Sequence, residues 1–287
     1  MILSTVNFSP MNAYAASGGG GRSENIGIIS GTDSHSLSAS DLMDVNYISN
    51  SNYFLINPSH HDNDQNTNLN PVGVCTTVAL QMLMGYHNYY SDRRLIPASG
   101  NGQTFLNANY GDINKHPALQ TTMPISGQGC YEIGTEDGFF DELYDLNCIA
   151  GLPPLGQAIG FVKDAGIYFM NNYTPTDVKN TVSLTSGVFS KSTAQADIDA
   201  GKPIVLGMQP ITGDESFHVV IVYGYAKLDG VDGFIVHYGF GAYRTQVWVP
   251  SSWFGFQIRM SVNHTHNYSD TGNNINNTHR ELQCGTC

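Results

Sequence analysis

Cys75 is the residue of this chain whose type and position best suit covalent chemistry. A turn at Pro71–Gly73 precedes it, and apolar residues then recur at intervals of three and four: Cys75, Val78, Ala79, Met82, Leu83 and Tyr86. This spacing is the rhythm of one helix face, and it predicts a buried helix with Cys75 in its first turn. There the unpaired N–H groups and the helix dipole favour a thiolate and can bind an oxyanion. The alternative is that Cys75 is an ordinary buried side chain.

Two histidines lie at the ends of two apolar runs far downstream of Cys75. The runs 216–225 and 234–241 are rich in β-branched and aromatic residues, and the Asp/Gly-rich segment 228–233 joins them. This pattern predicts a β-hairpin in which His218 opens the first strand and His237 closes the second. Pairing of the strands would bring the two rings near one another. A helix-start cysteine followed much later by a strand histidine is an order found in thiol hydrolases.

Three patches of the sequence carry a resemblance to a known family. They are Gly73–Ala79 together with His87–Tyr90, then Phe217–Tyr225, and then Val236–Gly241. These patches are similar to the papain-like cysteine peptidases, and in particular to the streptopain-related bacterial group. The resemblance covers roughly residues 70–255. The chain departs from the family pattern at His237, where the family commonly has asparagine, and at Tyr238 and Phe240, where it has tryptophan.

The resemblance implies a papain-like α+β fold, in which a helical half with the Cys helix packs on a twisted, mainly antiparallel sheet with the histidine. It also implies a cysteine endopeptidase that acts on proteins or peptides and needs neither cofactor nor metal. Cys75 would attack the peptide carbonyl after His218 takes its proton. His237 would bond to Nδ1 of His218 and fix its tautomer. Asp232 and Asp214 are the nearby carboxylates that could take this role instead.

The oxyanion hole and the exact reaction are open to more than one interpretation. Papain-like enzymes use a glutamine a few residues before the nucleophile, and here we choose Asn70, together with the Cys75 N–H, because of its proximity. The same scaffold also serves transglutaminase-like and deamidating acyl transferases. The departure at His237 further allows a catalytically weak binding module.

The remaining sequence predicts one domain with loose ends. The predicted elements are strands at 53–56, 204–208 and 245–250 and helices at 137–150, 155–165 and 193–200, the second helix ending at the breaker Gly166. We divide the chain into a flexible lead at 1–50, rich in Ser, Gly and Asn, a peptidase domain at 51–262, and a polar tail at 263–287 that ends in a Cys-x-x-Cys motif.

Charge and composition exclude several kinds of partner. The 24 acidic and 12 basic residues give a formal net charge of −12 without a basic cluster, which argues against nucleic acid. No apolar run reaches the roughly 18 residues of a membrane span. We expect a secreted or cell-surface monomer. The Ala-x-Ala pattern at Ala13–Ala16 fits either a signal-peptide remnant or an ordinary N-terminus.

The cysteine count points again to Cys75. The other four cysteines are Cys130, Cys148, Cys284 and Cys287. The first two flank a predicted helix and could pair in an oxidising compartment, and the last two could pair at the end of the chain, which leaves Cys75 as a free thiol. The His/Asp loop at 60–64 and the histidines of the tail lack a recognised metal spacing, so we expect no metal site.

Overall fold

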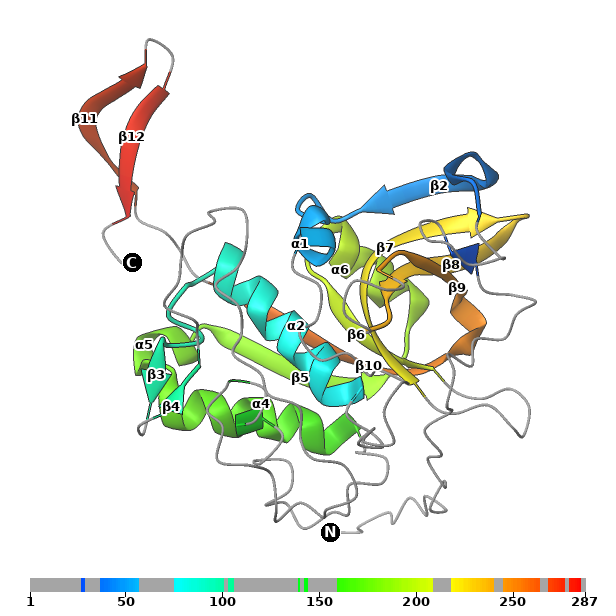
Figure 1. Ribbon diagram of the computed structural model, residues 1–287, viewed down its shortest axis with the longest axis horizontal. Helices are drawn as coiled ribbons and strands as arrows, with labels where there is room; N and C mark the ends of the chain where they lie inside the picture. Colours follow the sequence, from blue (N-terminus) through cyan, green and yellow to red (C-terminus); the bar gives the residue numbers. More distant parts are fainter. Residues whose placement is uncertain are drawn as a thin grey trace.

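The computed structural model of this protein shows helices packed against an antiparallel sheet (Figure 1). It describes residues 27–28, 37–56, 75–100, 103–105, 139, 142–143, 159–208, 218–239, 245–263, 268–276 and 279–284. The helices are α1 (Asn52–Ile56), α2 (Cys75–Tyr90), α4 (Ile159–Tyr173), α5 (Thr176–Lys179) and α6 (Lys191–Asp199), with 3-10 turns η1 (Ala39–Asp41) and η2 (Ser251–Trp253). The strands are β1 (Gly27–Ile28), β2 (Leu42–Tyr47), β3 (Ser99–Gly100), β4 (Gln103–Thr104), β5 (Val182–Val188), β6 (Ile204–Met208), β7 (His218–Leu228), β8 (Val231–His237), β9 (Val247–Pro250), β10 (Phe254–Val262), β11 (Tyr268–Asn276) and β12 (His279–Cys284). The predicted α+β class is confirmed.

The main sheet is open and is built around β7. Its described strands lie in the order β1-β9-β8-β7-β6-β10-β5, and β2 also pairs with β7. Along one edge of β7, residues 218–222 pair with β6 and residues 224–228 pair with β2. Strand β8 pairs with the opposite edge of β7. Asp229 and Gly230 join β7 to β8 with φ values of 50° and 80°, which suits a tight hairpin turn. The predicted hairpin that begins at His218 and ends at His237 is therefore confirmed.

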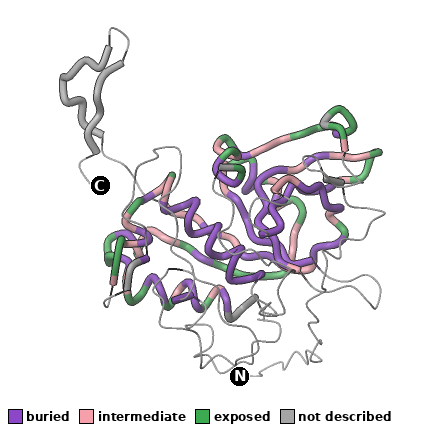
Figure 2. Tube along the Cα trace, viewed as in Figure 1, coloured by how far each residue is buried: buried purple, intermediate pink, exposed green. Residues whose placement is uncertain are grey.

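Helix α2 is buried on all sides along most of its length. It contains no Asp, Glu, Lys or Arg, and every residue from Cys75 to Asn88 is buried (Figure 2). The helix contacts β7, β6, β10 and α4. Because no side chain of the helix carries a full charge at neutral pH, other elements can cover it on every side. The prediction of a buried helix with Cys75 in its first turn is confirmed.

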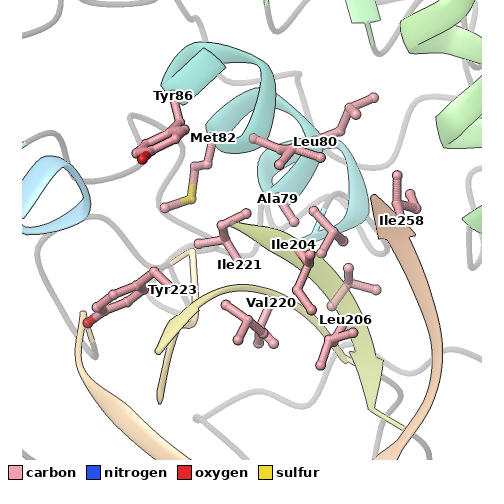
Figure 3. Packing of buried hydrophobic residues seen from close by; sticks show 14 of the residues in the cluster. Ala79, Leu80, Met82, Tyr86, Ile204, Leu206, Val220, Ile221, Tyr223 and Ile258 are labelled. Carbon is pink, nitrogen blue, oxygen red and sulfur yellow. The ribbon is translucent and has the colours of Figure 1, made fainter. Parts of the chain in front are cut away.

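The core between α2 and the sheet is aliphatic near the start of the helix and aromatic near its end. Figure 3 shows Ala79 and Met82 of α2 over Ile221 of β7, and Tyr86 on the same side as Tyr223. Ile221 and Tyr223 are fully buried. This packing fixes α2 against β7 and so sets the position of Cys75 relative to the first residues of that strand.

Residues 53–56 form the last part of α1 and not the predicted strand. The Tyr53 and Phe54 N–H groups donate to carbonyls three residues earlier, which is the bonding of a tight helical turn. This turn places the Phe54 ring between two others, 5.6 Å from Tyr86 and 5.3 Å from Tyr223 between ring centroids. Packing against these rings outweighs the strand propensity of an aromatic and β-branched run.

Helix α4 continues past Gly166, where we predicted that a helix would end. A Cβ on Gly166 would lie 2.9 Å from a methyl group of Leu184 and 3.3 Å from one of Leu80. The glycine therefore allows α4 to approach β5 and α2 closely, and it does not interrupt the helix. Of the helix predicted at 137–150, only positions 139, 142 and 143 are described, and all three are helical.

Some of the other predicted elements are confirmed, and some observed strands were not predicted. The helix at 193–200 and the strands at 204–208 and 245–250 correspond to α6, β6 and β9. Strands β5 and β10 were not predicted. Strand β2 lies in the sheet although it falls within the predicted lead at 1–50, and β11 and β12 pair with each other within the predicted polar tail.

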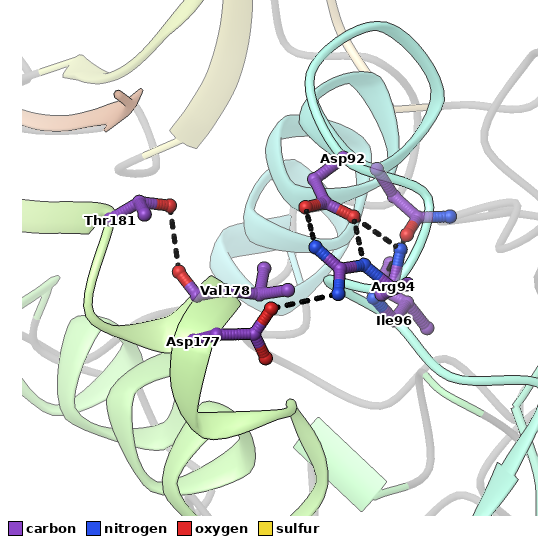
Figure 4. Close-up of polar contacts among 7 residues, drawn as sticks. Asp92, Arg94, Ile96, Asp177, Val178 and Thr181 are labelled. Carbon is purple, nitrogen blue, oxygen red and sulfur yellow. Dashed lines mark hydrogen bonds and ion pairs between the residues drawn. The ribbon is translucent and has the colours of Figure 1, made fainter. Parts of the chain in front are cut away.

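An ion-pair cluster ties the loop after α2 to α5 (Figure 4). Arg94 donates from Nε and Nη2 to the carboxylate of Asp92, at 3.1 and 2.8 Å, and from Nη1 to Asp177 at 2.8 Å. The Asp92 side chain is only 1% exposed. Forked, charge-assisted hydrogen bonds of this kind are stronger than neutral ones. They stabilise the C-terminal end of the helix that begins at Cys75.

Gly233 of β8 lies against the indole ring of Trp248 of β9. A Cβ at Gly233 would lie 2.3 Å from Cε2 of Trp248, whose Nε1 donates to the Ala226 carbonyl at 3.2 Å. We expect Gly233→Ala to displace the ring and to lower the free energy of unfolding by about 2–3 kcal/mol, measured by urea denaturation. Gly187→Ala is the matched control, because a Cβ there meets nothing within 4 Å, and it should change stability by less than about 0.5 kcal/mol. Equal losses in the two variants would contradict this account.

Candidate active site

Cys75 is the first residue of α2 and is a free, buried cysteine. Its thiol lies against the Val219 backbone N–H, one residue after His218 on β7, and 4.0 Å from the Thr76 hydroxyl oxygen. Burial raises the pKa of the thiol, while the Val219 N–H, the Thr76 hydroxyl and the N–H groups of Thr76 and Cys75 lower it by smaller amounts. The pKa of Cys75 is raised overall, so the sulfur is a thiol at neutral pH. The helix dipole alone would favour a thiolate.

His218 begins β7 and is half-buried. Its Nε2 lies 2.9 Å from the backbone carbonyl oxygen of Tyr238, and its ring stacks on the Tyr238 ring with centroids 5.0 Å apart. A carbonyl oxygen can only accept a hydrogen bond, so this contact requires a proton on Nε2. In the neutral ring, Nδ1 then carries the lone pair and can act as a base.

Tyr238 joins His218 to the neighbouring strand β6. Its hydroxyl reaches Met208 of β6, with 3.9 Å between the oxygen and Sδ, and Met208 pairs with His218 across the sheet. Tyr238 itself is 3% exposed. The tyrosine side chain therefore packs against both His218 and Met208.

His237 lies on the opposite face of the sheet from His218, which corrects the expectation that the two rings would meet. The register pairs His237 with Ile221, three residues after His218, and side chains alternate between faces along a strand. His237 is fully buried, and its Nδ1 accepts a hydrogen bond from the Gly239 N–H at 2.8 Å. The group that bonds to Nε2 of His218 is thus a backbone carbonyl, which no residue-type pattern reveals.

The other predicted site residues are only partly described. Asn70 and Asp214 lie outside the described residues. Asp232 pairs with Lys227 across the β7–β8 hairpin, at the end away from His218, and it forms an ion pair with Lys191 at 2.6 Å. The hydrogen bond and charge of Lys191 lower the pKa of Asp232. Asp232 is therefore placed away from the His218 ring.

Metal and membrane sites can be considered only for the described part of the chain. There, no group of three or more His, Cys, Asp or Glu residues could hold a metal ion. Among the same residues, no helix is long and apolar enough to cross a membrane. The His/Asp loop at 60–64 and the four other cysteine side chains lie outside what the structure describes.

Comparison with known proteins adds no assignment to this geometry. No protein-family model matches the chain, and no curated protein matches it either.

Proposed function

We propose that this chain is a thiol-dependent peptide-bond hydrolase with a papain-like arrangement of Cys75 and His218. One observation carries the proposal: the Cys75 sulfur at the start of α2 lies against the backbone next to His218, whose Nε2 is held by a carbonyl so that Nδ1 is the basic nitrogen. A helix-start thiol and an imidazole with a fixed tautomer are the two groups that nucleophilic cysteine catalysis requires.

The raised pKa of Cys75 favours general-base activation over a preformed ion pair. His218 Nδ1 would take the thiol proton as the sulfur attacks the peptide carbonyl, and the same proton would pass to the leaving amine. Water, deprotonated by His218, would then release the acyl group from the sulfur. The carbonyl oxygen that becomes negative would lie near the first N–H groups of α2, with Asn70 as the proposed second donor.

The substrate class and location follow from the same proposal. A protein or peptide substrate fits a hydrolase of this kind, and we propose that the enzyme is secreted or on the cell surface. An acyl transferase would use the same Cys75 and His218 but would pass the acyl group to an amine. Product analysis with and without an added amine acceptor distinguishes the two reactions.

Selective alkylation tests the nucleophile. We expect limiting iodoacetamide to modify Cys75 at a rate that rises with pH through a value above the ordinary cysteine pKa of about 8.5, mapped peptide by peptide with mass spectrometry. A peptide epoxide, which needs correct placement beside the sulfur, should modify Cys75 far faster than any other cysteine, and His218→Gln should slow this reaction. If the epoxide reacted with Cys75 no faster than with the other cysteines, the chain would be a binding module and not a hydrolase.

A further inference from the structure

The peptide group between Tyr238 and Gly239 is bonded at both of its ends by histidines. Its carbonyl oxygen, on Tyr238, lies 2.9 Å from Nε2 of His218. Its N–H, on Gly239, donates to Nδ1 of His237 at 2.8 Å. The C=O and N–H of a trans peptide point in opposite directions within one plane. The two histidines therefore bond to opposite edges of the same peptide group. This explains how rings on opposite faces of the sheet can act on one another.

The bond from Gly239 to His237 spans two residues, as in the turns that Asn and Asp side chains form with the backbone. Nδ1 of histidine and Oδ1 of asparagine are separated from Cα by the same number of bonds. His237 therefore takes the place of an acceptor that an asparagine would supply. Because Nδ1 accepts, it carries no proton in this arrangement.

The same turn is fixed against the helix that carries the thiol. Gly239 has φ of +81°, a conformation that favours glycine, and a Cβ there would lie 3.0 Å from Val78 of α2. Val78 lies about one helical turn after Cys75. A change in the orientation of this peptide would therefore alter the placement of His218 relative to Cys75.

We infer that His237 is a positioning residue, which orients His218 through the Tyr238–Gly239 peptide group and not by direct contact. The expected effect on kcat rests on the proposed function, whereas the expected effect on the tautomer of His218 does not. When the Gly239 N–H is held by Nδ1, the peptide plane cannot rotate, and the Tyr238 carbonyl stays aligned with Nε2 of His218. Linked hydrogen bonds of this kind also polarise one another.

Two variants of His237 distinguish the effect of its hydrogen-bond acceptor from the effect of its side-chain volume. His237→Asn keeps an acceptor that can reach the Gly239 N–H, whereas His237→Leu fills space and has none. With a peptide reporter, we expect His237→Leu to lower kcat by about 10- to 100-fold with little change in KM, and His237→Asn to retain most of kcat. Equal losses of kcat in both variants would overturn the inference, because a merely structural role would not depend on the acceptor.

Nitrogen NMR of histidine-labelled protein tests the same point without activity. His218→Gln identifies the His218 signals, and Nε2 of His218 should be protonated in the wild type and in His237→Asn. In His237→Leu the ring should become a mixture of the two tautomers. An unchanged tautomer in a folded His237→Leu protein would overturn the inference even if Cys75 proved to be catalytic. If Cys75 proved inert, the tautomer shift would still support the inference.

A measurement on the wild-type protein covers the case in which His237→Leu does not fold. A scalar coupling across the hydrogen bond should link the Gly239 amide nitrogen to Nδ1 of His237. A protonated Nδ1 on His237 at neutral pH, with no such coupling, would overturn the inference without any variant.

Discussion

Replacing Cys75 with alanine should abolish peptide hydrolysis and leave the fold intact. The proposed mechanism has no second nucleophile, so the loss of kcat should be at least about ten-thousandfold. Cys75 is 8% exposed and is the first residue of α2, and the change removes one sulfur atom. We therefore expect the free energy of unfolding to change by about 1 kcal/mol. Hydrolysis of a peptide reporter and urea denaturation measure the two effects.

His218→Ala should be nearly as damaging, and the double variant should be no worse than Cys75→Ala alone. Groups that act as one unit in catalysis are strongly non-additive, because each is of little use without the other. Cys284→Ala is the control for the loss of a thiol as such and should keep full activity. Near-normal hydrolysis by Cys75→Ala would show that the nucleophile lies elsewhere. Losses that simply multiply would show that Cys75 and His218 act separately.

The sequence predicted the elements that carry these two residues because both have strong local patterns. The three- and four-residue spacing after Cys75 and the turn at Asp229 and Gly230 are signals of short range. They locate a helix start and a hairpin, which here are α2 and the β7–β8 pair.

The orientation of His218 could not be predicted in the same way. Whether His237 and His218 share a face depends on a register of strand pairing, and a shift of one residue reverses the answer. The orienting group is a carbonyl, which every residue possesses, so the residue type at 238 gives no signal. His237, where the chain departs from the pattern that it resembles, accepts the bond that forms this turn, but its residue type did not predict the turn.

Tertiary contacts explain the other differences. Phe54 is helical because its ring lies between Tyr86 and Tyr223, and Gly166 is inside α4 because α2 and β5 approach it closely. Each is a case in which a contact distant in sequence outweighs local propensity. Strand β10, which follows β9 after the short turn η2, was not predicted.

His87 should make the protein less stable in acid. It lies near the end of α2, is 3% exposed, and its Nδ1 is 3.1 Å from the Ser91 hydroxyl oxygen. Burial lowers its pKa to about 4, with a further lowering by the charge of Lys202 and a partial offset by the Met260 backbone. In the unfolded chain the pKa is about 6.5, so the unfolded state binds more protons between pH 6.5 and 4. Stability is therefore complete above about pH 6.5 and falls as the pH falls, by up to about 3 kcal/mol.

Urea denaturation between about pH 7.5 and pH 4 measures this loss, and two variants isolate it from the carboxylates that titrate in the same range. His87→Gln cannot take up the proton, so its free energy of unfolding should fall less steeply with falling pH than that of the wild type. Lys202→Met removes the cation but keeps the buried imidazole, so it should show an intermediate slope. What matters is the slope and not the absolute stability, because either change also alters local packing. If all three proteins lost stability in parallel, His87 would not be the group responsible, and the acid sensitivity would have to come from the paired carboxylates, such as Asp92 with Arg94.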